Sequence, residues 1–328
     1  EGEDVMNVLL KQAESYAYTE YKGKIQNWGY IANLSLNRFY YSQRDNHSER
    51  YGFQPSLLVS YNPVDNLHFR YHINLKNNAP SIAYLNDVEQ RIDILQTRRG
   101  NPDLKSFRST IQDFNAIFST GIFSIDALVS YAYEKNPIME SVIYEEGMFI
   151  HTYENQKSFQ HLAAEVTFNI KPWKDHISLS VTPRINRYIS TGNNYLHTYT
   201  LKELRINLDA SYKNWLLSFM TITPPNRYVY GEQLLKGDLM HTLMIGYKQP
   251  AWSIMAGIHN PFMKTYRSEN ANGSALNPVK SDIHSTNMSN TIVVKLNFNL
   301  NFGRQYKGAN KGIQNIDTDS GILQGTKE

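Results

Sequence analysis

Apolar and polar residues alternate with a period of two along most of this chain. Near the C-terminal end, Ile292, Val294, Leu296, Phe298, Leu300 and Phe302 stand between residues that are polar except for Val293. Successive side chains of a β-strand point to opposite faces, so this spacing gives each strand one apolar and one polar face. The pattern predicts an all-β protein, because it recurs in 67–75, 177–186 and 204–212, and near 30–40, 53–61, 123–133, 162–170, 239–247 and 252–258.

The length of these segments bears on the class of β protein. Many run to ten residues or more, whereas strands of globular proteins average about five or six. A tilted strand needs about 9–11 residues to cross a membrane. No stretch approaches the roughly 18 consecutive apolar residues of a membrane helix. The segments therefore favour a transmembrane antiparallel β-barrel over a soluble sandwich or propeller.

The connections between the segments alternate in length. Short turns are expected near Lys24–Asn27, Asn62–Asn66, Ser119–Gly121, Pro172–Lys174, Tyr212–Asn214 and Gln249–Pro250. Longer links are expected over Gln43–Glu49, Asn77–Lys105, Asn136–Phe159, Thr191–Thr198, Pro224–Gly237 and Asn260–Thr286. Outer-membrane barrels pair short periplasmic turns with long extracellular loops in this way. The four tryptophans support the same interpretation, since an interfacial aromatic belt belongs at the turns where they stand: Trp28, Trp173, Trp215 and Trp252.

The strand count predicts that the sheet is larger than this chain. About thirteen strands are expected, but single-chain bacterial barrels have even numbers, and lipid does not tolerate an open sheet edge. We expect these strands to belong to a barrel of about 22. Residues 1–303 would then form the barrel portion and residues 304–328 a periplasmic C-terminal tail. The start at Glu1 shows no signal peptide, so we expect either its removal or a start within a longer protein.

Composition fits a wall between lipid and water. Apolar residues make up 41% and charged residues 19%, yet the mean hydropathy is −0.50, because neutral polar residues fill the difference together with 23 Tyr. The absence of cysteine excludes disulfides and thiolate metal sites. A net charge of +3 without a Lys/Arg run argues against nucleic acid as a partner. No P-loop, G-x-S-x-G or H-E-x-x-H motif is present, so we expect no catalytic residues, metal or cofactor, and no enzyme.

One loop segment carries a family resemblance. Arg99-Gly100-Asn101-Pro102-Asp103-Leu104 resembles the Gly-Asn-Pro-x-Leu motif that closes a long extracellular loop in the outer-membrane β-barrel family of Bacteroidetes TonB-dependent receptors. The resemblance extends over nearly the whole chain, through Tyr18 to Leu36 followed by Ser48-Glu49-Arg50-Tyr51, through Thr152-Tyr153-Glu154-Asn155, and through Asn301-Phe302-Gly303-Arg304 with Asp317-Thr318-Asp319-Ser320-Gly321-Ile322.

This resemblance implies a function and a set of partners. It implies uptake of a scarce nutrient, such as an iron chelate, a vitamin, a glycan or a peptide, across the bacterial outer membrane. The expected partners are outer-membrane lipid, a TonB-type energy-coupling complex and a candidate surface lipoprotein. The N-terminal plug domain and TonB box of the family are absent from this chain, so both would belong to a missing part. A structural or secretory barrel that works without TonB remains the alternative.

The lumen-facing side chains supply one set of candidate substrate-binding residues. His68, Arg70 and His72 share the inward face of one strand, but the two imidazoles lie roughly 13 Å apart, too far to share a metal. A polar lumen wall competes here with a substrate or plug contact. Three arginines, Arg184, Arg187 and Arg205, could draw anions into the lumen. Pairing with barrel or plug carboxylates is their alternative role.

The loop from Asn77 to Lys105 supplies the second set. It carries several charges, Arg98 and Arg99 among them. An unstructured loop of this length is uncommon, and such loops are commonly functional. Substrate capture by these arginines and a folded extracellular flap whose charges pair with one another both remain open.

Overall fold

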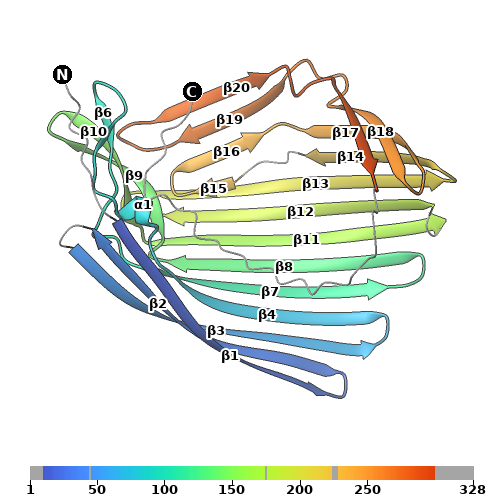
Figure 1. Cartoon of the computed structure of the whole chain (residues 1–328), viewed down its shortest axis with the longest axis horizontal. Coiled ribbons are helices and arrows are strands. Elements are labelled where there is room, and N and C mark those ends of the chain that lie inside the picture. Colours follow the sequence, from blue (N-terminus) through green and yellow to red (C-terminus); the bar gives the residue numbers. More distant parts are fainter. Residues whose placement is uncertain (1–9, 44–45, 174–175, 224–227, 300–328) are drawn as a thin grey trace.

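A single large sheet dominates the computed structural model, which describes residues 10–43, 46–173, 176–223 and 228–299. This sheet has thirteen antiparallel strands (Figure 1). Their order in the sheet follows their order along the chain, and the short strands of the long links are not part of it. In order they are β1 (Leu10–Ile25), β2 (Trp28–Gln43), β3 (Asn46–Val64), β4 (Leu67–Asn78), β7 (Phe107–Ser119), β8 (Phe123–Lys135), β11 (Ser158–Trp173), β12 (Ile177–Thr191), β13 (Leu196–Tyr212), β14 (Trp215–Thr223), β17 (Met240–Lys248), β18 (Trp252–His259) and β21 (Thr291–Phe298).

The predicted count of thirteen strands is confirmed, and short turns join the strands at one end of the sheet. One predicted link is wrong. β2 and β3 stay paired as far as Gln43 and Asn46, so no long loop spans Gln43–Glu49. The polar residues there interrupt the apolar alternation, but backbone pairing continues because strands project beyond the apolar zone. The predicted tail 304–328 and the segment Asn301–Arg304 lie outside the described residues.

The two faces of the sheet differ in chemistry. On one face, the rings of Trp28, Tyr61, Phe69 and Phe114 form a stacked row across four strands, with centroids 4.3, 6.4 and 6.3 Å apart. On the opposite face, His72 stands across from Asp113 in the register. Such alternation, apolar outside and polar inside, is that of a membrane barrel wall.

The long links fold into two small sheets at the end opposite the short turns (Figure 1). The first loop sheet has the order β5 (Gln90–Arg91), β6 (Gln96–Arg98), β10 (Met148–Asn155) and β9 (Ile138–Glu145), preceded by the short helix α1 (Ile82–Leu85). The second loop sheet has the order β15 (Tyr228–Tyr230), β16 (Gln233–Gly237), β19 (Tyr266–Asn272) and β20 (Val279–Ser285). By the general rule for outer-membrane barrels, this loop-bearing end is extracellular.

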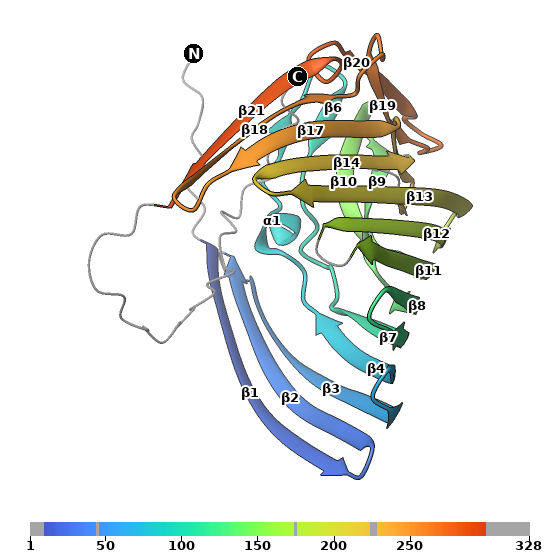
Figure 2. The same ribbon diagram turned by 90° about the vertical axis from the view of Figure 1, so that its right-hand side faces the viewer.

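The buried core lies between these loops and the wall. One cluster joins Phe39 and Tyr41 of β2 to loop residues that include Ile82 and Leu85. A second joins wall residues, Tyr188 and Leu201 among them, to loop residues that include Val229. The wall members belong to the polar face, which is therefore the inner, concave one. Figure 2 shows the sheet curving around α1 on this side.

The large sheet is open within the described chain, because β1 and β21 each pair with only one strand there. The part of the chain that the structure describes holds no helix long and apolar enough to cross a membrane.

Candidate functional site: the lumen wall and the mouth

Two of the predicted residues come together in a lumen cleft of about 450 Å³. Arg70 and His72 of β4 line it with Asp113, Asn115 and Asp126 of the next two strands. The imidazole Nδ1 of His72 lies 3.6 Å from a carboxylate oxygen of Asp113, and the Asn115 amide donates to Asp126. Arg70 has no ion-pair partner among the described residues. The cleft thus offers one unpaired guanidinium beside two carboxylates.

His68 lies apart from this cleft, nearer the short turn. Its Nδ1 is 2.9 Å from the side-chain oxygen of Asn62. Across the described ranges, no group of three or more His, Asp or Glu is placed to hold a metal ion. His68 is therefore held by a hydrogen bond within the wall, whereas the side chains of Arg70 and His72 line the open cleft.

The three lumen arginines have different surroundings. Arg184 lies 3.6 Å from Glu165 and 3.9 Å from Glu203, so its charge is balanced across neighbouring strands. Arg205 shares this face, is exposed, and has no ion-pair partner in the described part of the chain. The expectation that Arg187 also faces the lumen is wrong, because a step of three residues from Arg184 reverses the face.

Of the predicted loop residues, Arg98 ends β6 of the first loop sheet and Arg99 directly follows that strand. Arg99 pairs with Glu145 across the sheet at 2.7 Å. Arg98 extends β6 beside β10, where its charge helps to lower the pKa of His151, although burial of the imidazole is the larger cause. This arrangement supports the folded-flap interpretation, in which the charges of the loop serve its own structure.

The Gly-Asn-Pro motif hydrogen-bonds to two other segments, the residues around α1 and strand β10. The Gly100 amide donates to the carbonyl of Asn86 at 2.7 Å, and the Asn101 amide to the carbonyl of Tyr84 at 2.6 Å. The Asn101 side chain donates to the carbonyl of Tyr153 in β10 at 2.9 Å. The motif therefore binds the α1 segment and the first loop sheet together.

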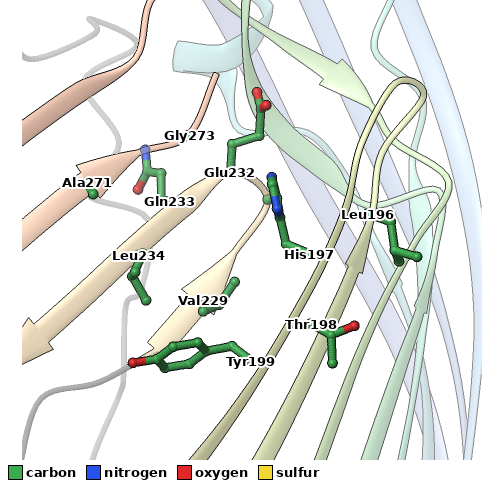
Figure 3. Close-up of a pocket in the computed structure, with 11 residues that line it drawn as sticks. Leu196, His197, Thr198, Tyr199, Val229, Glu232, Gln233, Leu234, Ala271 and Gly273 are labelled. Atoms are coloured by element: carbon green, nitrogen blue, oxygen red, sulfur yellow. The ribbon is translucent and has the colours of Figure 1, made fainter. Parts of the chain in front are cut away.

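A cavity of about 390 Å³ lies at the mouth, between β13 and the second loop sheet (Figure 3). Tyr199, Val229 and Leu234 give it apolar walls, and His197 and Glu232 supply polar groups. The Nε2 atom of His197 is buried without a hydrogen-bond partner among the described residues. Burial raises the pKa of the Glu232 carboxyl, an effect that nearby His197 opposes.

This combination suits a small organic ligand that carries both apolar surface and a polar group, since such pockets are mostly apolar with a few placed polar groups. The cavity does not follow from the sequence pattern, because Thr191–Thr198 was predicted to be a loop, whereas β13 begins at Leu196. A usable signal existed: His197, Tyr199, Leu201 and Glu203 continue the inward alternation of β13.

A curved sheet of long antiparallel strands, apolar outside and polar within, defines an outer-membrane β-barrel protein. A family model described as the outer membrane protein beta-barrel family matches residues 7–223, and the chain belongs to that family. Its location is the bacterial outer membrane. A comparison with curated protein sequences found no match.

Several solved structures share the fold. The FrpB iron transporter from Neisseria meningitidis is 10% identical with a TM-score of 0.64, over 90% of this chain and 46% of that one. The siderophore receptor PirA from Pseudomonas aeruginosa is 12% identical with a TM-score of 0.58, over 89% and 57%. The ferric enterobactin receptor PfeA from Pseudomonas aeruginosa, as a mutant, is 16% identical with a TM-score of 0.57, over 83% and 44%. The chain thus spans about half the length of these receptors.

Proposed function

We propose that this chain forms part of the barrel of a TonB-dependent receptor that takes up a scarce nutrient. The observation that carries the proposal is the seating of both loop sheets inside the mouth by buried clusters on the inner wall. An open diffusion pore needs an unobstructed lumen, whereas a receptor needs a ligand-binding surface there. The similar structures support the same function, since FrpB is an iron transporter and PirA a siderophore receptor.

In this proposal the ligand first occupies the mouth cavity. Tyr199 and Val229 contact its apolar surface, and His197 and Glu232 bind a polar group. Arg70 and Arg205 then line the way through the lumen. The plug that blocks this way, and the segment that contacts the TonB complex, would be supplied by parts of the protein outside this chain.

Contacts between the two loop sheets would have to yield during uptake. The Asn277 amide donates to Gln96 at 2.9 Å, and Gln233 donates to Glu140. On the wall side, the Tyr230 hydroxyl donates to Glu134 at 3.0 Å. These polar contacts tie the first loop sheet and its adjoining wall to the second, so we propose that they close the mouth.

The test is growth of a strain that lacks the complete protein, complemented with the wild type. The strain is starved in turn of iron, a vitamin, a glycan or a peptide source, with ferric chelates tried first. We expect growth on one nutrient class to depend on both the protein and TonB. Growth that needs the protein but not TonB would contradict the proposal and favour the structural or secretory alternative.

The mouth cavity is tested by ligand affinity once the nutrient class is known. His197→Ala removes the buried imidazole, and we expect roughly tenfold weaker binding of the nutrient to the purified complete protein. The matched control is Thr200→Ala, an exposed position on the outer face of the same strand. Equal affinity of both variants would remove His197 from the binding site.

A further inference from the structure

The outer face of the wall changes from apolar to basic at the loop-bearing end. Along β12 the outward residues are apolar as far as Ile185, and the next outward residue is Arg187. On β13 the outward residue next to Leu204 on the loop side is Lys202. On β7 and β8 the outward residues nearest the loops are Arg108 and Lys135. Arg108, Lys135, Arg187 and Lys202 are all exposed, and together they are called the basic row here.

The basic row consists of two pairs of neighbouring residues, one on β7 and β8 and the other on β12 and β13. Arg108 lies directly opposite Lys135 in the register of β7 and β8. Arg187 lies opposite Thr200, and Lys202 is the next outward residue of that strand. Like charges on directly opposite strand positions are destabilising unless something neutralises them. An anion bound at the row would relieve the repulsion between Arg108 and Lys135 and would be attracted by Arg187 and Lys202.

The wall does not supply that anion. Among outward strand residues near this level, Glu49 is already paired with Arg38. The nearest acidic residue of β8, Glu134, faces inward and accepts from the Tyr230 hydroxyl. No ion pair to any member of the basic row exists within the described ranges. Charge balance must come from outside the wall.

The level of the row points to the membrane surface. The ten residue steps from Ile177 to Arg187 span roughly 33 Å along the strand. At the usual strand tilt this is roughly 25 Å along the barrel axis, the height of the apolar band of such barrels. The row thus stands where the headgroups of the outer leaflet begin.

We propose that the basic row binds the phosphate groups of an anionic glycolipid of the outer leaflet. Arginine guanidinium groups match phosphate oxygens with two parallel hydrogen bonds. A lipid fits better than free phosphate, because exposed apolar side chains lie beside and below Arg187. Leu162, opposite Arg187 in the register, is 45% exposed, and Ile185 is 42% exposed. Acyl chains would cover these side chains while the phosphates meet the charges above.

The experiment measures lipid retention by native mass spectrometry of the complete protein in detergent. The probe is bisphosphorylated lipid A, compared with the same lipid after removal of both phosphates. The test variant combines Arg108→Gln, Lys135→Gln, Arg187→Gln and Lys202→Gln. We expect its affinity for lipid A to fall roughly fivefold for each charge removed, and the dephosphorylated lipid to bind weakly to every variant.

Two controls keep the proposal falsifiable. The variant Arg70→Gln/Arg205→Gln removes two lumen charges by the same substitution, and we expect it to retain lipid A like the wild type. The variant Arg108→Lys/Arg187→Lys keeps the charges, and we expect it to retain most of the binding. Equal binding of both lipid forms would overturn the proposal. So would equal losses in row and lumen variants, or displacement of lipid A by inorganic phosphate at comparable concentration.

Discussion

At the residue scale, Gly100 occupies a position that leaves no room for a side chain. A Cβ atom there would lie 2.5 Å from the carbonyl oxygens of both Tyr84 and Asn86. We predict that Gly100→Ala displaces the Gly-Asn-Pro motif from the α1 segment, at a cost of about 1–3 kcal/mol for the seated loop. Hydrogen exchange of the amides over 98–105 should become faster, and limited proteolysis after Arg98 or Arg99 should become easier.

The matched control for this prediction is Gly121→Ala. No atom lies within 4 Å of a Cβ at Gly121, which stands in a short turn at the other end of the wall. We expect its exchange over 98–105 to equal that of the wild type. Unchanged protection in Gly100→Ala would show that the loop can shift its carbonyls at little cost.

At the element scale, β10 carries His151 into the contact between the loop sheets. Its Nε2 lies 2.9 Å from the Gln96 side-chain oxygen and 3.4 Å from the Asn277 amide. Burial lowers the pKa of His151, with Glu140 opposing the shift. The docked loops therefore bind fewer protons at this site than undocked loops, whose histidine titrates near 6.5. The stability of docking should accordingly fall as the pH drops below about 6.5 toward the lowered pKa.

Hydrogen exchange at β6 and β10, corrected for its intrinsic pH dependence, measures this effect. We expect protection to decrease on acidification in the wild type and to change less in His151→Gln, which stays neutral. The control His284→Gln alters an exposed imidazole of β20 and should leave the wild-type pH dependence intact. Identical pH profiles for wild type and His151→Gln would exclude His151 as the titrating group.

The long strands could be predicted because membrane crossing imposes a repeated pattern on each of them. The alternation of Ile177, Leu179 and Val181 with serines and threonine marks β12 without any knowledge of its neighbours. The short strands inside the loops show no comparable alternation of apolar and polar residues. β15 and β16 are three and five residues long, and their apolar residues face a wall that the sequence does not locate. Pairing there depends on contacts between distant segments, which one sequence does not reveal.

The same distinction applies to the candidate site, where strand spacing predicts the facing of some residues and only the folded loops bring others together. Arg70 and His72 could be placed on the inner face from spacing alone, because a strand fixes which residues share a face. The mouth cavity could not be predicted, because Glu232 meets His197 only after the second loop sheet folds onto β13. Arg187 shows how strictly the facing of a strand residue depends on its position in the alternation, since an error of one residue exchanges the lipid side and the lumen.

At the scale of the whole molecule, uptake as proposed requires the two loop sheets to separate. The chain contains no cysteine, so a pair introduced into it reacts without background from these residues. We predict that Glu140→Cys/Gln233→Cys, joined by a short bismaleimide in cells, stops nutrient uptake, because the cross-link holds the hydrogen-bonded pair between the sheets in its closed arrangement. Uptake of the labelled nutrient, before and after cross-linking, measures the effect.

The control places the same cross-link inside one sheet. Gln233 and Asn272 stand directly opposite each other on β16 and β19, so Gln233→Cys/Asn272→Cys joins two strands that are already paired within one sheet. We expect uptake through this variant to survive the reagent. If both cross-linked variants transport equally well, the loop sheets need not part, and the ligand must pass beside them along the inner wall. If both are blocked, the second loop sheet itself has to rearrange, and separation of the two sheets is not the step that limits uptake.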